Sequence, residues 1–533
     1  MNYFSVLNRL SNCSQKAFEV LLGYGLTGEV SRKGILIHSD LIRLEYNLAE
    51  AASDSTFIEQ LIHHPQDLDK LFLGKSVLLN RVLFKRIVDK CLSYISNTAN
   101  SPALFSSWDH YLFKAHIQAQ DSPEWFREAF WDINVHAINL VARSYGIVAP
   151  IKGSNHSGLS DGPLVFVFKC PPRLAHYFNL RSFLKSAVSI SDTTCFRVIF
   201  LDVVKTAKLD LPCKIFYLGH LPLQEKINAY STILGNTKAS SVIWVASVQN
   251  LGLYMFSRIW PHQSYWSMKY HSIYSPTIDA YYKTSTTASR QQIDGNFWTG
   301  VPAKIDHLFS HQPGSTTNCY PQRIAKWESV NRPLPVLTLG RQIKISGHQY
   351  KSVAAKLLLG NVRLAYSGRA PAPWHELIAK TSPQNLEFLG WLKESQLEHF
   401  LGQSLVYLDS FPFGGGHTCF AALTCQTPIL MLDTEQNRRC SFMMHLLDIA
   451  EFFGFNVVSP CVKAELGIFA DPTDIQDFIL SVSFKATSSI QALSKIQKVQ
   501  YDLFARWISD DSFDSELKKT LAIMLRTNAF DYS

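Results

Sequence analysis

Hydrophobic residues recur every three or four positions through the first 155 residues of the chain, and Gly, Ser, Asn or Pro interrupt the pattern. LIRLEYNLAEAA (41–52) and EWFREAFWDINVHAINLVARSYG (124–146) are two such segments. This spacing places the apolar side chains on one face of a helix. We therefore predict an all-helical N-terminal domain over residues 1–155. No repeat of fixed length occurs in it, so the pattern does not indicate a solenoid.

The pattern changes after IKGSNHSGLSDGP (151–163), which is rich in Gly and Ser and is typical of a linker. Short, continuous apolar runs then alternate with helical segments. Because strands covered on both faces read as such runs, the alternation predicts a parallel sheet between helices, which is a Rossmann-like domain over residues 156–315. Its predicted strands lie at 163–170, 195–204, 214–220, 241–248 and 264–272.

The same alternation continues and predicts a second Rossmann-like domain over residues 316–533. Ligands of such sheets bind at the carboxyl ends of the strands, so the residues that follow each strand are candidates for a site. The predicted strands of this domain lie at 335–341, 361–369, 385–390, 404–411 and 428–433.

Composition narrows the class of protein. A chain of 533 residues, 47% of them hydrophobic, can bury the cores of about three domains. The formal net charge is +8 without any run of five or six basic residues, so nucleic acid is not indicated as a partner, while a small anionic substrate is compatible. No apolar run approaches the ~20 residues of a membrane helix, and the N-terminus lacks the pattern of a signal peptide. We expect neither export nor a membrane span.

The ten cysteines form no C-x-x-C pair and no spacing of zinc ligands, so structural zinc is not expected. Several of them lie in apolar, strand-like runs, where a free cysteine behaves as a small hydrophobic residue. This usage fits a reducing compartment and predicts a cytoplasmic protein.

The most informative stretch runs from Ser404 to Glu435. An apolar strand is followed by Asp409, a Phe-Pro-Phe corner, the three glycines 414–416 and the start of a helix at His417. Glycine lets the backbone approach a ligand closely, and the amides and dipole of a helix start favour phosphate oxygens. The stretch therefore predicts a phosphate or diphosphate site, although a tight turn that needs glycine only for steric reasons is the alternative.

DSFPFGGGHT (409–418), followed by ALTCQTPILML, resembles the nucleotide-sugar site of GT-B glycosyltransferases. It is most similar to glycosyltransferase family 41, which includes O-GlcNAc transferase and the bacterial cytoplasmic N-glycosyltransferases of adhesins, and the FPFG match is closest to the latter. The resemblance implies a GT-B fold, in which two Rossmann-like domains face a cleft, here preceded by the all-α domain. In the family an acidic residue one turn into the helix binds the ribose hydroxyls, whereas this chain has Ala421 there.

The resemblance also implies roles for further residues of the second domain. The loop residues Gly414, Gly415, Gly416, His417 and Thr418 would hold the diphosphate of a UDP-sugar, and Thr418 as a mere helix cap is the alternative. A basic residue past the first strand would clamp the same diphosphate. Lys344 is the candidate, expected to be exposed, with Arg341 as its rival, and two solvated surface cations are the alternative. Asp409 would bind loop amides or the ligand. Glu435 and Arg439 match an acidic-then-basic pair of the family, either as sugar contacts or as a structural ion pair.

Three histidines at predicted strand ends of the first domain are candidates for catalysis: His176, His220 and His271. His220 lies in YLGHLP, similar to the S-D-F-x-x-H-P element of the family, and His271 follows RIWPHQ (258–263), which resembles its R-x-A-P-x-Q signature. A structural role is the alternative for each.

The resemblance thus implies an inverting transferase that moves a hexose, with glucose as first expectation, from a UDP-sugar to an Asn or Ser/Thr side chain of a protein or peptide. No D-x-D element ends a predicted strand, so no metal is expected, and no cofactor beyond the UDP-sugar co-substrate is implied. Two alternatives stay open: transfer to a glycan or lipid carrier, and a catalytically silent GT-B partner of an active glycosyltransferase, which Ala421 motivates.

Overall fold

The computed structural model describes residues 162–526 apart from short internal gaps, so the predicted all-helical domain and most of the linker lie outside the described residues. The gaps are 169–174, 192–194, 206–208, 246–253, 255–257, 268–276, 294–295, 303–318, 341–343, 346, 369–370, 373, 380–383, 412–413 and 511. The described residues divide into two compact units. The first contains the residues up to 284 together with 289–300 and 518–526, and the second contains 285–288 and 301–517.

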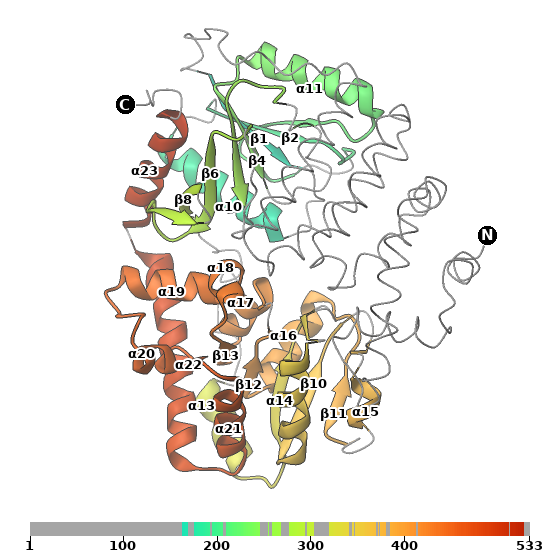
Figure 1. Cartoon of the computed structure of the whole chain (residues 1–533), viewed down its shortest axis with the longest axis vertical. Coiled ribbons are helices and arrows are strands. Elements are labelled where there is room, and N and C mark those ends of the chain that lie inside the picture. The colour runs from blue at the N-terminus through green and yellow to red at the C-terminus, as the bar shows by residue number, and fades with distance from the viewer. Residues whose placement is uncertain are drawn as a thin grey trace, which may run out of the picture. The chain divides into compact units, whose positions relative to one another are not determined.

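The first unit is built on an eight-stranded sheet with the order β3-β2-β1-β4-β5-β6-β8-β7. Strands β1, β2, β4, β6 and β8 of this sheet are labelled in Figure 1. Strands β1 to β6 pair in parallel, and β7 and β8 form an antiparallel hairpin. The strands are β1 (Leu164–Phe168), β2 (Phe196–Phe200), β3 (Lys214–Tyr217), β4 (Ser241–Val245), β5 (Gln263–Ser267), β6 (Ala280–Ser285), β7 (Arg290–Ile293) and β8 (Asn296–Pro302). The helices are α10 (Ala175–Ile190) and α11 (Leu223–Thr237).

The second unit has a six-stranded, fully parallel sheet with the order β11-β10-β9-β12-β13-β14. Its strands are β9 (Leu334–Thr338), β10 (Val362–Tyr366), β11 (Leu386–Phe388), β12 (Val406–Leu408), β13 (Ile429–Leu432) and β14 (Ile468–Phe469). Its helices are α13 (Tyr320–Glu328), α14 (His348–Leu359), α15 (His375–Ala379), α16 (Glu394–Gln403), α17 (His417–Thr424), α18 (Glu435–Cys440), α19 (Phe442–Phe452), α20 (Pro460–Glu465), α21 (Pro472–Ser483) and α22 (Thr487–Ser509). The last helix, α23 (Ser512–Arg526), begins in the second unit, and its residues 518–526 belong to the first.

Both sheets share one strand order: in each, the third, second, first, fourth, fifth and sixth strands of the unit are neighbours. This is the doubly wound order of Rossmann-like folds. The predicted α/β class with two Rossmann-like sheets is therefore confirmed, and all ten predicted strands are present. Four further strands, β6, β7, β8 and β14, were not predicted. In β6 the buried residues Lys283, Thr284 and Ser285 are polar, so the strand does not read as an apolar run.

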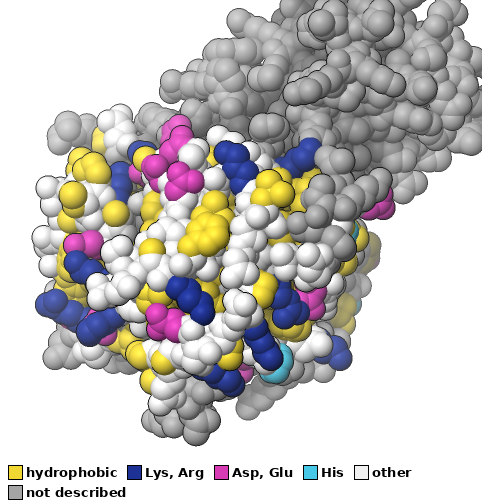
Figure 2. All heavy atoms as spheres, turned by 90° about the horizontal axis from the view of Figure 1, so that it is seen from below, with side chains coloured by type: hydrophobic (Ala, Val, Ile, Leu, Met, Phe, Trp, Pro, Cys, Tyr) yellow, Lys and Arg dark blue, Asp and Glu magenta, His cyan; other side chains and the backbone are white. Residues whose placement is uncertain are grey.

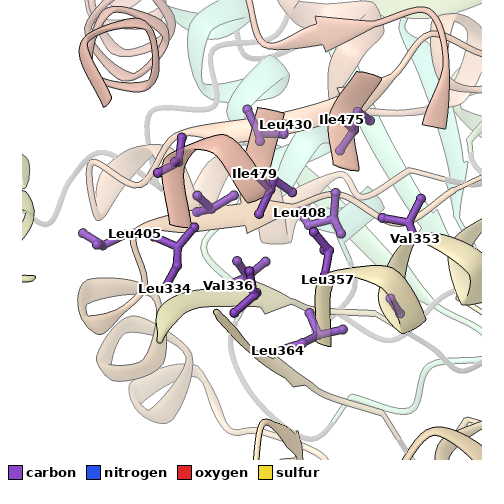
Figure 3. Packing of buried hydrophobic residues seen from close by; sticks show 14 of the residues in the cluster. Leu334, Val336, Val353, Leu357, Leu364, Leu405, Leu408, Leu430, Ile475 and Ile479 are labelled. Atoms are coloured by element: carbon purple, nitrogen blue, oxygen red, sulfur yellow. The ribbon is translucent and has the colours of Figure 1, made fainter. Parts of the chain in front are cut away.

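The core of the second unit forms where α14 and α21 pack over the sheet (Figure 3). Val336 of β9 and Leu408 of β12 belong to the same buried cluster as side chains of both helices, and each of these two residues is at most 1% exposed. The strands read as continuous apolar runs because both of their faces are covered. This core keeps the strand ends in fixed places, and the candidate site is built on those ends.

The described surface carries no dominant charge on the face seen in Figure 2, where Lys and Arg side chains are scattered among acidic, hydrophobic and other side chains. Within the part of the chain that the structure describes, no helix is both long and apolar enough to span a bilayer.

Candidate functional site

The second sheet places its candidate residues at the point where the strand order reverses, between β9 and β12. The chain leaves these two neighbouring strands in opposite directions, and ligands of such sheets bind outside their carboxyl ends. Lys344 follows β9, and the glycine loop 414–416 follows β12. The Nζ atom of Lys344 donates to the carbonyl oxygen of Gly414 at 2.6 Å, so the structure brings these two elements together.

The glycine loop is held by hydrogen bonds within the protein. The amide of Gly414 donates to Oδ1 of Asn437 at 2.6 Å, and the amide of Gly415 donates to Oδ1 of Asp409 at 2.7 Å. The carbonyl of Gly415 accepts from the amide of Phe442 at 2.8 Å. Two of the loop amides expected to face phosphate are therefore used internally. The amides of residues 416–418 lie at the start of α17, and the amides of a helix start are in general the donors suited to an anion.

Close packing explains two of the three glycines. A Cβ atom on Gly414 would lie 2.6 Å from Oδ2 of Asp409, and one on Gly415 would lie 2.7 Å from Oγ1 of Thr418. A Cβ atom on Gly416 would meet nothing within 4 Å. None of the three has a positive φ, so the loop does not require glycine for a left-handed backbone. Gly416 is the loop position that faces open space.

Asp409 is fully buried beneath the loop. Its Oδ1 atom accepts from the amides of Ser410 (2.8 Å) and Gly415, whereas Oδ2 has no hydrogen-bond partner among the described residues. Burial raises the pKa of this carboxyl group, against the opposing effects of the Gly415 hydrogen bond and the positive charge of Lys344. Of the two roles expected for Asp409, the structure shows the first, which is to hold loop amides.

Lys344 is half-buried, so the expectation that it is exposed was wrong. Its hydrogen bond to the loop and its interaction with the buried Asp409 place it inside the loop structure. Its rival, Arg341, lies outside the described residues.

Helix α17 begins with Gly416 as its N-cap, without a capping side chain. The alternative role of Thr418, as the cap of this helix, is therefore wrong. Its Oγ1 accepts from the hydroxyl of Tyr407 at 3.0 Å. His417, the first helical residue, is half-buried and its ring lies 6.5 Å from that of Phe420. Ala421, one turn into the helix, is also half-buried.

The opposite end of α17 is fixed by a residue that the sequence analysis missed. The guanidinium of Arg323 donates from Nη2 to the carbonyls of Cys425 and Gln426, both at 2.8 Å. A cation at the carboxyl end of a helix interacts favourably with its dipole. Arg323 is only 8% exposed, and a lone arginine inside the amphipathic pattern of α13 gave no sign of this contact.

The segment after β13 contains an ion-pair cluster around Asp433, and the predicted pair of Glu435 and Arg439 stays a prediction. Asp433 accepts from Arg438 at 2.5 Å and from Lys463 at 2.8 Å, and although burial opposes the effect, these two cations lower the pKa of Asp433. Glu435 begins α18 and is exposed, and the side chain of Arg439 is outside the described part.

Of the three candidate histidines of the first unit, the structure describes the side chain of His220 alone, so their role stays a prediction. His176 lies in the first turn of α10, after β1, but its side chain is not among those described. His220 is exposed in the turn after β3, and His271 lies outside the described residues. Next to His220, Gly219 packs on the backbone between Asp202 and Val203, so the turns after β2 and β3 lie side by side.

The RIWPHQ element has a structural role at the amino ends of β5 and β6. Arg258 donates to Oδ1 of Asp279 at 2.8 Å and to the carbonyl of Pro261 at 2.7 Å. Gln263 donates from Nε2 to the carbonyl of Thr277 at 2.7 Å. These contacts lie at the opposite ends of the strands from a ligand site.

Metal ligands and thiols are two further kinds of group to consider among the described residues. No group of three or more His, Cys, Asp or Glu side chains there could hold a metal ion. The six cysteines whose side chains the structure describes are all free thiols: Cys195, Cys213, Cys319, Cys419, Cys425 and Cys461.

No protein-family model matches the sequence, and no curated protein matches it. Solved structures are similar. A mutant of the O-GlcNAc transferase of Thermobaculum terrenum matches with a TM-score of 0.50 and 14% identity over 96% of this chain and 98% of that chain. A glycosyltransferase from Rickettsia africae matches with a TM-score of 0.44 and 10% identity over 69% of this chain and 99% of its own. HepE of Anabaena, in complex with UDP and glucose, matches with a TM-score of 0.41 and 12% identity over 68% of this chain and 99% of its own. The first likeness shows that the chain shares the fold of that transferase, and it agrees with the predicted GT-B class.

Proposed function

We propose that this protein is a glycosyltransferase that binds a UDP-sugar at the carboxyl ends of β9 and β12. The observation that carries the proposal is the contact of Lys344 with the glycine loop at the switch point, beside the start of α17. A cation and a helix N-terminus at one place suit a diphosphate. The resemblance of residues 409–418 to the family 41 motif supports the same ligand.

Each element of the site has a task in this reaction. The amides of residues 416–418, with the side chains of His417 and Thr418, would donate to the diphosphate, and Lys344 would add a positive charge. When the bond between the sugar's anomeric carbon and the phosphate oxygen breaks, negative charge grows on the leaving UDP. A fixed cation and a helix dipole stabilise that charge more in the transition state than in the ground state, and so raise the rate.

The acceptor in this proposal is the side chain of an Asn, Ser or Thr in a protein or peptide, and the sugar is a hexose, glucose first. The acceptor atom attacks the anomeric carbon from the face opposite to UDP, so that the configuration inverts, and its proton passes to a base. His176, His220 and His271 are the candidates for the base. The reaction needs no metal or cofactor, and it takes place in the cytoplasm.

Two other functions remain candidates. Transfer to a glycan or a lipid carrier would use the same donor site. A catalytically silent partner of an active glycosyltransferase is favoured by one observation, the presence of Ala421 where family members carry an acid.

Calorimetric titration with UDP tests the donor site. Lys344→Met keeps the apolar stem of the side chain and removes the charge, and we expect it to raise the Kd at least tenfold, because a charge-assisted hydrogen bond is worth roughly 1.5 to 3 kcal/mol. Lys485→Met is the matched control, since Lys485 also donates to backbone carbonyls, those of Glu328 (2.7 Å) and Val330 (3.1 Å), before β9 begins. Equal Kd values for both variants and the wild type would remove Lys344 from the site.

Transfer assays then separate the acceptors. The protein is incubated with radiolabelled UDP-glucose and UDP-N-acetylglucosamine over a peptide array and, separately, with glycans and lipid carriers, each with and without EDTA. We expect label on peptides in the presence of EDTA. Label on glycans or lipids alone would favour the second function, UDP binding without any transfer would favour the silent partner, and loss of transfer in EDTA would contradict the metal-independent mechanism.

A further inference from the structure

Asn437, in α18, is fully buried and joins the end of β13 to the glycine loop. Its Oδ1 accepts from the amide of Gly414 at 2.6 Å, and its Nδ2 donates to the carbonyl of Leu432, the last residue of β13, at 2.9 Å. Its own carbonyl accepts from Oγ of Ser441 at 2.6 Å. Each polar atom of the side chain is thus used, on one side by the strand and on the other by the loop.

The planarity of the peptide bond extends this contact to the direction in which the loop amides point. In a trans peptide the C=O and the following N–H point in opposite directions. The peptide between Gly414 and Gly415 is held at both ends, by Lys344 on its carbonyl and by Asp409 on its amide. Asn437 holds the peptide before it through the amide of Gly414. Two successive peptide planes are therefore fixed.

The same rule determines the orientation of the third peptide. The carbonyl of Gly415 accepts from the amide of Phe442, at the start of α19, so the amide of Gly416 points away from α19. On Gly416 a Cβ atom would meet nothing within 4 Å, so there is room for a ligand beside this residue. Together with the start of α17, the fixed loop offers a preorganised set of donors to an anion.

We propose that Asn437 is a positioning residue of the donor site: by holding the amide of Gly414, it keeps the loop in the conformation that turns the amides of residues 416–418 toward the diphosphate. The inference rests on the proposed function and assigns a residue outside the sequence motif to it. Asn437 touches no substrate, and its effect on UDP passes through the loop.

Gln500, in α22, provides a matched control because its side chain binds the same strand, β13. It is also a fully buried amide side chain, and it accepts from the amide of Ile429 at 3.0 Å and donates to the carbonyls of Ile429 (2.7 Å) and Leu466 (2.8 Å). Ile429 is the first residue of β13, whereas Leu432 is the last. Gln500→Ala therefore removes buried hydrogen bonds from the amino end of the strand, where the inference predicts no effect on UDP.

The test compares Asn437→Ala with Gln500→Ala by UDP titration and by hydrogen exchange of the unliganded proteins. We expect Asn437→Ala to raise the Kd for UDP and the KM for the UDP-sugar at least tenfold, with the KM for the acceptor unchanged, and to speed exchange in the peptide that covers residues 409–416. Gln500→Ala should leave the UDP Kd within twofold and the exchange of that peptide unchanged. Equal UDP Kd values for the two variants, or unchanged exchange of 409–416 in Asn437→Ala, would overturn the inference.

Asn437→Asp provides a second variant if the alanine protein does not fold. A carboxylate keeps the acceptor for Gly414 but loses the donor to Leu432, and a protonated carboxyl offers both. We expect the ratio of its UDP Kd to that of the wild type to fall as the pH is lowered, and a constant ratio would contradict the positioning role. If the wild type itself does not bind UDP, the proposed function fails, while the exchange experiment still decides whether Asn437 holds the loop.

Discussion

The two ends of the six-stranded sheet use buried polar groups in opposite ways. At the amino ends of β12 and β13, the guanidinium of Arg323 donates to the backbone carbonyls of Leu401, Gly402, Ser404, Cys425 and Gln426. At the carboxyl ends, one buried group is the acid Asp409, which accepts from the amide of Gly415 and whose Oδ2 has no hydrogen-bond partner among the described residues. Helix α17 runs between the two ends. Its carboxyl end is held by a cation, and its amino end is where we propose that the diphosphate binds.

The first unit shows the amino-end pattern a second time. Arg258 and Gln263 bind backbone carbonyls before β5 and β6 begin, as Arg323 does in the second unit. Buried polar side chains at amino ends therefore complete the hydrogen bonding of the backbone, and those at the carboxyl ends of β12 and β13 hold a loop that can meet a ligand.

The largest effect that this comparison predicts is on stability. Arg323→Met should lower the free energy of unfolding of the second unit by about 3 kcal/mol or more, because several buried carbonyls lose their donor at once. Urea denaturation followed by tryptophan fluorescence measures the loss. At temperatures where the variant is folded, its UDP Kd should equal that of the wild type. A tenfold weaker Kd would show that the amino end also shapes the site and would break the comparison.

The next effect separates the glycines of the loop. Gly414→Ala places a Cβ atom 2.6 Å from Oδ2 of Asp409 and 2.8 Å from Oδ1 of Asn437, so the loop must move. We expect a loss of about 1 to 3 kcal/mol of stability, the usual cost of overpacking, and loss of UDP binding. Gly416→Ala adds its methyl group to open space and should leave the melting temperature within about 2 °C of the wild type.

Titration calorimetry with UDP completes the glycine comparison. The methyl group in Gly416→Ala lies where the diphosphate would approach, so UDP binding should weaken even though the fold is intact. Unchanged binding by this variant would place the ligand elsewhere, and a stable Gly414→Ala protein with normal UDP affinity would contradict the fixed loop.

The sequence was sufficient to predict the architecture because strands covered on both faces must be apolar, and ten such runs were visible. It was also sufficient for the loop, since Gly414–Gly416 before a helix start is a local pattern. It did not reveal β6, whose buried Lys283 donates to Gln291 on β7. That partner becomes a neighbour only after the sheet forms, and a lysine in a strand otherwise indicates solvent.

The supporting residues of the site were missed for the same reason. Asn437 follows Asp409 by 28 positions in the chain, and nothing in TEQNRR distinguishes a buried asparagine from an exposed one. We expected Lys344 to be exposed, and it is half-buried. The sequence shows a lysine after β9, but it does not show that this lysine will bind the carbonyl of Gly414. The burial of Asn437 and that of Lys344 both depend on contacts with Gly414, which is far from each of them in the chain.

A pH series compares the acids that follow β12 and β13. Burial raises the pKa of Asp409 above its ordinary 3.8, so the native state binds the proton more tightly than the unfolded state. The stability that this group contributes is therefore complete below 3.8 and is lost as the pH rises through the native pKa. The side chain in Asp409→Asn does not titrate. The melting temperature of this variant minus that of the wild type should therefore increase as the pH rises from about 4 to 8.

For Asp433 we expect the opposite dependence of stability on pH, because its pKa is lowered. Its pKa lies below 3.8 because of Lys463 and Arg438, although burial opposes them, so its contribution is present above 3.8 and is lost only as the pH falls through the lowered value. Between about pH 4 and 8, the difference in melting temperature between Asp433→Asn and the wild type should therefore stay constant. Parallel pH trends for the two variants would show that the two carboxylates do not differ in this way.

The smallest expected effect concerns the one position of the motif where the chain departs from the family. Ala421 is half-buried on α17, one turn beyond His417, and if the ribose lies there, a carboxylate at 421 would accept hydrogen bonds from its hydroxyls. Ala421→Asp should then strengthen UDP binding by about 1.5 kcal/mol, or roughly tenfold in Kd, because hydrogen bonds to charged groups contribute about that much.

The added negative charge also repels the diphosphate, and 2′-deoxy-UDP separates the two effects: it keeps the diphosphate and lacks one hydroxyl. A gain with UDP that shrinks with 2′-deoxy-UDP would place the ribose at this turn of α17. Equal weakening of both ligands would place the phosphates there instead, which would move the donor further along the helix than the contact of Lys344 with Gly414 indicates.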